Sequence, residues 1–170
     1  MDATYRLVYE VAAGEGPPDR VEVSQRPPRR RIDVVAADGT ADATITDGEA
    51  TWQCRLEGSW RCAELGDPAV SAALDQAVVD ALSDALLAGA EDYEFTVEER
   101  VVLGEPARCL RTALRPEARG QAGLGGLGEL CLAADGAILA VDTPTGTLRA
   151  VEHSPDVADD AFELPAPPDT

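Results

Sequence analysis

The chain has 170 residues, of which 32 are acidic and 14 basic, and its formal net charge at pH 7 is −18. This charge repels the phosphates of nucleic acids and of anionic lipids, so we expect no nucleic-acid partner. Apolar residues make up 45% of the chain, which indicates a single globular domain over residues 1–170. No apolar run reaches the ~18 residues of a transmembrane segment.

The first segment reads as two strands. Tyr5, Leu7 and Tyr9 alternate with the side chains between them, which predicts a half-buried strand with its aromatic side inward. In the second, Pro27 and Pro28 interrupt the alternation, and prolines confine such a segment to an edge strand or a bulge. Residues 29–31 are all Arg. We interpret them as a solvated edge that discourages strand addition, with a basic docking spot as the alternative.

The next segment predicts a meander of antiparallel strands, because two Asp-Gly turn signals, at Asp38 and Asp47, separate short stretches of strand composition. Trp52 and Trp60 fall on its last two strands. In a chain with few aromatic residues we expect both to anchor the core, and stacking on a ligand is the alternative.

The four cysteines allow three pairings. Cys54 and Cys62 lie symmetrically about Gly58, so a hairpin turning there sets them opposite each other as a cross-strand disulfide. Cys109 and Cys131 lie near the ends of two later strand patterns, and we expect them to pair similarly. Zinc is the competing interpretation, but CxxC spacing is missing and the chain has one His. Disulfides imply an oxidising compartment.

Residues 67–89 carry the one long helical pattern of the chain. Asp67 suits the N-cap, Pro68 the first helical position and Gly89 the C-terminal end. Apolar residues recur at spacings of three and four along this segment. They include Leu74, Val78 and Leu82. We therefore predict an amphipathic helix whose apolar side must be covered.

The remaining chain again reads as strands. Phe95 and Val97 alternate with polar neighbours, and Asp-Gly at Asp135 and Thr-Gly at Thr145 signal turns between further short strands. The glycine-rich segment 116–128 lacks the strand and helix that flank a dinucleotide-binding GxGxxG motif. We interpret it as a loop, with a ligand gate as the functional alternative.

Catalytic motifs are missing from the sequence. His153, Ser154 and Asp156 are the nearest approach to a Ser/His/Asp set, but such close neighbours rarely meet in one site, and no GxSxG motif is present. Adjacent acids such as residues 98–99 and 159–160 could suggest the carboxylate pair of a glycoside hydrolase, but such pairs are expected on the surface of an acidic chain. No DxDxDG calcium loop occurs. We expect neither an enzyme nor a bound metal or cofactor.

Several stretches together resemble a known family. They are TYRLVYEV, TITDGEATWQC, the helical pattern from Pro68, ADGAILAVD, GTLRAVEHS and the terminal AFELP of residues 161–165. This order is similar to that of the LolA/LolB and LppX/LprG superfamily of exported lipid and lipoprotein carriers. The resemblance implies an α+β fold, a half-open antiparallel barrel of about ten or eleven strands with a central amphipathic helix as lid.

The resemblance also implies a function. We expect an extracytoplasmic carrier, without catalysis, that holds an acyl chain or another hydrophobic molecule between sheet and helix. Cysteine pairs look like an addition found in exported actinobacterial relatives, many of them lipoproteins, so we expect a signal or lipid anchor before residue 1. The alternative is an envelope sensor or protein-interaction domain with a filled core. The candidate lining residues, for which ordinary core packing is the other interpretation, are Tyr5, Leu7, Tyr9, Leu74, Val78, Leu82, Phe95 and Val97.

Overall fold

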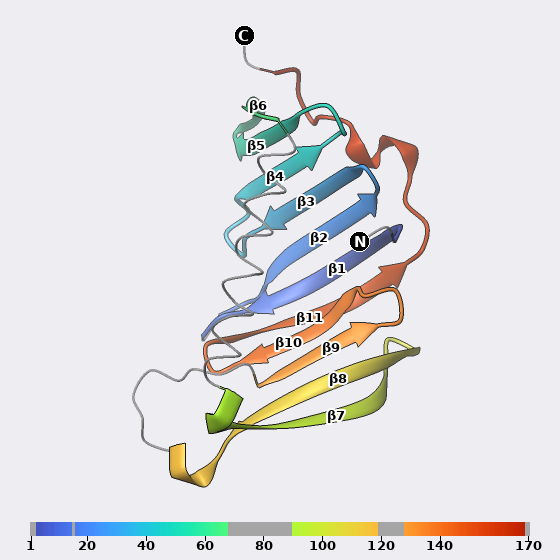
Figure 1. Cartoon of the computed structure of the whole chain (residues 1–170). Helices are drawn as coiled ribbons and strands as arrows, with labels where there is room; N and C mark the ends of the chain where they lie inside the picture. The colour runs from blue at the N-terminus through green and yellow to red at the C-terminus, as the bar shows by residue number, and fades with distance from the viewer. Residues whose placement is uncertain (1–2, 15, 68–89, 119–127, 169–170) are drawn as a thin grey trace.

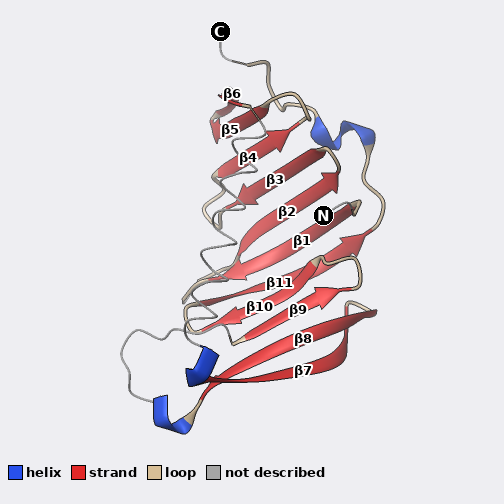
Figure 2. Ribbon diagram, viewed as in Figure 1, coloured by secondary structure: helices blue, strands red, loops and turns tan. Residues whose placement is uncertain are grey.

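A computed structural model of the chain describes residues 3–14, 16–67, 90–118 and 128–168. The described residues form eleven strands in one antiparallel sheet, with three short 3₁₀ helices at its margins (Figures 1 and 2). The first six strands are β1 (Tyr5–Ala12), β2 (Asp19–Arg26), β3 (Arg29–Val35), β4 (Ala41–Thr46), β5 (Thr51–Glu57) and β6 (Ser59–Gly66). The other five are β7 (Tyr93–Val102), β8 (Glu105–Leu114), β9 (Glu129–Ala133), β10 (Ile138–Thr143) and β11 (Gly146–Ser154).

The sheet is built outward from the two ends of the chain. Its strand order is β6-β5-β4-β3-β2-β1-β11-β10-β9-β8-β7, so the first and last strands are neighbours in the middle. From β1 the chain meanders to one edge at β6, and from the other edge at β7 it meanders back to β11 (Figure 1). Every neighbouring pair except β1 and β11 is therefore also consecutive in the chain.

The predicted half-open barrel with a helical lid is wrong. The number of strands agrees, but β6 and β7 lie at opposite edges and do not pair with each other, so the sheet is open. The described residues are almost entirely strand and contain no α-helix, and thus no helix long and apolar enough to cross a membrane. The predicted helix at residues 67–89 lies outside the described residues, apart from its first residue. The sheet is open because the strands of each meander pair with one another, and the two meanders pair with each other only between β1 and β11.

The interpretation of residues 27–31 as an edge strand is also wrong. Pro27 and Pro28 form the turn between β2 and β3, with a cis peptide bond between them, and β3 lies inside the sheet between β2 and β4. The prolines do not weaken a strand because neither has to donate a hydrogen bond to a neighbour there. The arginines that follow are the first residues of β3, which is an interior strand.

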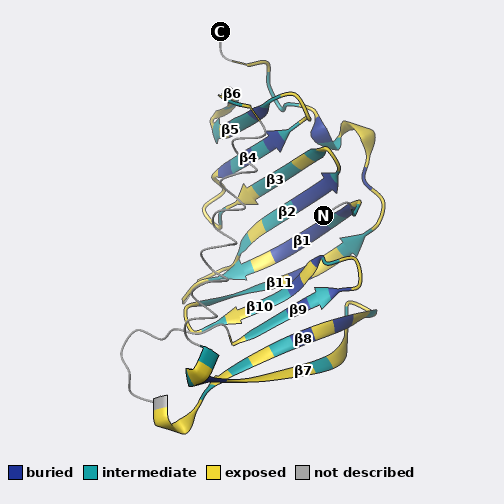
Figure 3. Ribbon diagram, viewed as in Figure 1, coloured by how far each residue is buried: buried dark blue, intermediate teal, exposed yellow. Residues whose placement is uncertain are grey.

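Two clusters of buried side chains stabilise the sheet. Figure 3 marks on the ribbon which residues are buried. The larger one joins the central strands to β8, β9 and β10 and includes Leu7 and Leu139, which are almost fully buried. The smaller one lies on β4, β5 and β6 around Ile45, and Trp52 and Trp60 pack against it. The tryptophans therefore anchor the core beside the first cysteine pair, as predicted.

Both predicted disulfides are present. Cys54 on β5 is directly opposite Cys62 on β6, and Cys109 on β8 is directly opposite Cys131 on β9, with S–S distances of 2.09 and 2.05 Å. All four cysteines are buried. Because their sulfurs are bonded to each other, they are not thiolate ligands for zinc. Two disulfides are compatible with an oxidising location outside the cytoplasm.

The C-terminal segment, residues 155–168, returns along the ends of the strands from β11 to β6 (Figure 1). Arg29 lies over the ring of the buried Phe162, and Arg31 donates hydrogen bonds to the carbonyl oxygens of Ala161 and Glu163. Beyond Phe162, the segment packs against the smaller cluster and ends in a bridge to β6. The arginines thus hold a segment of their own chain, where the sequence predicted a solvated edge.

Candidate functional site

The predicted lining residues do not form one wall. Tyr5, Leu7 and Tyr9 share one face of β1 and are buried in the larger cluster. Phe95 and Val97 lie on β7, at the edge of the sheet, and are 47% and 61% exposed. Four strands separate β1 from β7. The other three predicted residues lie outside the described residues; they are Leu74, Val78 and Leu82.

One face of the sheet carries an unbroken row of aliphatic side chains, one from each of six neighbouring strands. Each member is directly opposite the next in the strand register, so all six point to the same side. In order from β7 to β1 they are Val97, Leu110, Leu130, Val141, Leu148 and Val11. Val97 is 61% exposed, and the others are half-buried. We call these six residues the aliphatic row.

Alternation along the strands produces this row. In β8 and β9, Leu110 and Leu130 alternate with the cysteines of the second disulfide, which therefore points to the opposite face. Of the row, the sequence analysis identified Val97 alone. One sequence does not show which strands are partners. Each strand has an aliphatic residue at an alternate position, but this signal predicts a row only when the register between the strands is known.

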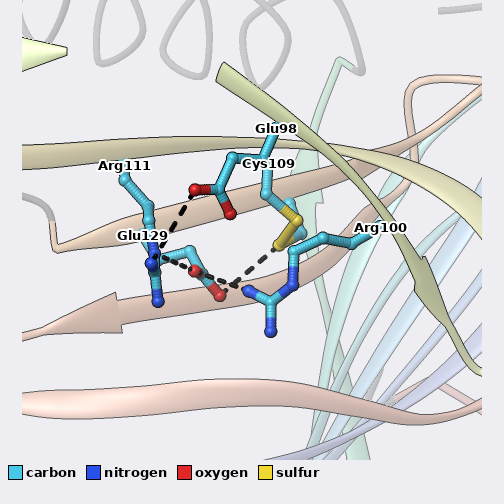
Figure 4. The surroundings of a disulfide bond; sticks show 6 residues. Glu98, Arg100, Cys109, Arg111 and Glu129 are labelled. Atoms are coloured by element: carbon cyan, nitrogen blue, oxygen red, sulfur yellow. Dashed lines mark hydrogen bonds and ion pairs between the residues drawn. A yellow bond between two sulfur atoms is a disulfide. The ribbon is translucent and has the colours of Figure 1, made fainter. Parts of the chain in front are cut away.

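Opposite the row, β8 and β9 carry buried members of the larger cluster, and an ion-pair group lies beside the second disulfide (Figure 4). Glu129 lies beside the Cys109–Cys131 disulfide and pairs with Arg100 at 2.8 Å and with Arg111 at 2.9 Å. A pocket of about 120 Å³ next to it is too small for a typical organic ligand, because such sites have volumes of ~300 Å³ or more.

The only histidine of the chain is buried among carboxylates. His153 Nδ1 lies 2.8 Å from Glu105 Oε2, and His153 Nε2 lies 3.6 Å from Asp135 Oδ2, which is beyond hydrogen-bond distance. The ring of Tyr5 meets the imidazole edge-on, and burial raises the pKa of the Tyr5 hydroxyl. Sequence reasoning missed both acidic partners because they are far from His153 in the chain.

The arrangement around His153 contains no aligned nucleophile among the described residues. The Ser154 hydroxyl accepts a hydrogen bond from the backbone N–H of Asp156 and lies near its carbonyl oxygen, so it closes a local turn. A hydrolase would need a hydroxyl or thiol directed at the imidazole. The described contacts of His153 join β11 to β8 and to the turn before β10.

A larger cleft, of about 350 Å³, lies on β5 and β6 at the other end of the sheet. Its volume falls in the range of small-molecule sites. Its lining residues are Gln53, Arg55, Glu57, Arg61, Ala63 and Leu65. None of them was among the predicted lining residues; three of them are charged, and charged side chains on an acidic chain are expected to be ordinary surface.

Comparison of the chain with models of known protein families and with curated proteins finds no match in either.

Proposed function

We propose that this protein is an extracytoplasmic binding protein that holds a hydrophobic, acyl-chain ligand on the face of the sheet that bears the aliphatic row. The observation that carries the proposal is the row itself. Six half-buried or exposed aliphatic side chains stand in register over five strand spacings, which is ~24 Å. An extended alkyl chain laid across the strands contacts all of them.

Binding of this kind depends on removal of apolar surface from water. Each methylene group that the ligand buries contributes ~0.8 kcal/mol, and no polar partner is required along the row. The expected specificity is therefore broad with respect to chain structure and sensitive to chain length. Catalysis has no part in this function.

The two disulfides support a location outside the cytoplasm, because thiols are kept reduced inside it. We place the protein among secreted proteins or membrane-anchored lipoproteins. In either location, a carrier has access to the lipids of the cell envelope.

The first test is mass spectrometry of an organic extract of the purified protein, together with displacement of a fluorescent fatty acid by unlabelled alkyl compounds. Val97→Asp places a charge in the row at a position exposed enough to leave folding intact. We expect it to weaken binding on the order of tenfold. Val101→Asp is the matched control, since Val101 is on the same strand, is 73% exposed and lies outside the row. Equal binding by wild type and both variants would contradict the proposal.

A second function, that of an envelope sensor or protein-interaction domain, is favoured by the edge strand β7. Among the described residues β7 pairs with β8 alone, and large apolar side chains of this edge are exposed. They are Phe95, Val97, Val101 and the adjoining Leu103. Such an edge is suited to strand addition by a partner. A protein of this kind would release no lipid on extraction, and Val101→Lys would block its partner.

A further inference from the structure

The face that bears the aliphatic row continues past β1 to the other edge of the sheet. On β1, Tyr9 shares a face with Val11, and the register connects Tyr9 through Val21 and Val34 to Asp42 on β4. From Asp42 it continues to two arginines. One surface is therefore aliphatic over most of its width and becomes charged at β4, β5 and β6.

The two arginines are directly opposite each other on adjacent strands. Arg55 of β5 faces Arg61 of β6 in the register, and like charges in this position repel. Arg55 donates a hydrogen bond from Nε to Asp42 at 2.7 Å, which leaves its terminal nitrogens free to donate elsewhere. Arg61 forms no ion pair with any of the described residues. An anion placed between the two guanidinium groups would remove the repulsion.

The cleft around the arginines combines charge with apolar surface. Ala63 and Leu65 line it beside the arginines, Gln53 adds an amide, and Glu57 is its single acid. Leu65 is 61% exposed. This composition fits a molecule with one anionic group and an adjoining apolar part, because guanidinium groups bind carboxylate or phosphate oxygens in pairs of hydrogen bonds.

The geometry points to an anionic amphiphile as the ligand, with its carboxylate or phosphate bound between Arg55 and Arg61 and its alkyl chain passing beside the Asp42–Arg55 ion pair of β4 and β5 toward Val34 and Val21. The inference rests on the proposed function and adds the head group to it. Five strand spacings separate β6 from β1, which is ~24 Å, so a twelve-carbon chain bound at the arginines lies over the strands next to β5 and only a longer chain also reaches the aliphatic row.

The test compares dodecanoate with dodecanol, whose alkyl chains have the same length, by calorimetry on wild type, Arg55→Gln, Arg61→Gln, Arg61→Lys and Arg108→Gln. Arg108 is an exposed arginine of β8 outside the cleft and is the matched control. We expect dodecanoate to bind more tightly than dodecanol. Each glutamine variant should weaken dodecanoate on the order of tenfold and leave dodecanol unchanged, since a hydrogen bond to a charged group is lost. Arg61→Lys should recover part of the loss, and Arg108→Gln should match wild type.

Equal affinity for the two probes, unchanged in the glutamine variants, would overturn the assignment of the head-group site and leave the proposed function standing. Binding of neither probe would overturn both. Inorganic phosphate and acetate are added separately. If they bind as tightly as dodecanoate, the cleft is a site for small anions and the amphiphile is rejected. Thermal unfolding of each variant shows whether a lost affinity reflects a lost fold.

Discussion

His153 Nδ1 lies 2.8 Å from Glu105 Oε2, and this contact connects β11, the last strand of the chain, to the beginning of β8. The imidazole is buried, whereas the carboxylate is partly exposed. Two strands, β9 and β10, lie between β11 and β8 in the sheet. The contact between His153 and Glu105 therefore stabilises the sheet by connecting strands that do not pair with each other.

We predict that His153→Ala lowers the free energy of unfolding by about 2 to 3 kcal/mol, through the cavity left by the ring and the lost hydrogen bond. Glu105→Gln should cost less, because the amide oxygen still accepts a hydrogen bond from Nδ1. Urea unfolding checks both. Glu99→Gln, an exposed acid on β7, is the control and should unfold as wild type does. A loss of stability in all three variants would show that His153 has no special part.

Phe162 should control attachment of the C-terminal segment. It is 7% exposed beneath Arg29, so Phe162→Ala removes a buried ring and should cost about 3 kcal/mol. We also expect faster hydrogen exchange and proteolysis within residues 155–168. The other phenylalanine of the chain, Phe95, is 47% exposed, and Phe95→Ala is therefore the matched control with little effect on either measurement. If exchange in the segment is unchanged in Phe162→Ala, the ring is not what holds it.

The two disulfides should differ in their contribution to stability. Cys54 and Cys62 are 8 positions apart, and Cys109 and Cys131 are 22 apart. Chain entropy gives about 2.5 kcal/mol for the shorter loop and about 3.5 kcal/mol for the longer one. We predict that replacing Cys109 and Cys131 by Ala destabilises the protein more than replacing Cys54 and Cys62. Denaturant titrations measure the difference, and the reverse order would mean that native packing around each bridge outweighs loop length.

Acid should weaken the turn between β4 and β5. Backbone N–H groups of Ala50 and Glu49 donate to Asp47 and hold the pKa of its carboxyl below the ordinary value of ~3.9. A lowered pKa in the folded state contributes stability above that ordinary value, and this contribution is lost as the pH falls through the lowered pKa. Asp47→Asn keeps an acceptor oxygen but does not titrate. We predict a flatter decline of unfolding free energy below about pH 4 in Asp47→Asn than in wild type. Identical pH profiles would show that Asp47 contributes nothing to acid sensitivity.

Local features of the fold were readable from the sequence. The Asp-Gly turns at Asp38, Asp47 and Asp135 occur as expected, because each lies between strands of clear alternation. Cys54 and Cys62 could be paired because a hairpin places residues symmetrically about its turn, and Gly58 has the positive φ that such a turn requires. In these cases every interaction needed for the prediction lay within a few residues.

Features that depend on distant contacts were not readable. The aliphatic row reaches the middle of the sheet only through the pairing of β1 with β11, which joins opposite ends of the chain and adds Val11 to the row. Arg29 and Arg31 resembled a solvated edge because their partners, around Phe162, lie far away in sequence. The open sheet was mistaken for a barrel for the same reason. A resemblance in the order of strands along the chain does not show whether the two outermost strands, here β6 and β7, pair with each other and close a barrel.

The central seam between β1 and β11 has a consequence for how the chain assembles. Arg6 and Glu152, which form an ion pair across it, are 146 positions apart, whereas each meander is made of contacts between consecutive strands. The hairpins of either meander can form early, and the non-local steps are their docking and the packing of residues 155–168 against β3 and β6. Until β11 arrives, β1 presents an open hydrophobic edge, which is the stage most exposed to misassembly. Two fragments separated between β6 and β7 would each keep one intact disulfide, and their recombination would require the pairing of β1 with β11 and the return of residues 155–168 to β3 and β6.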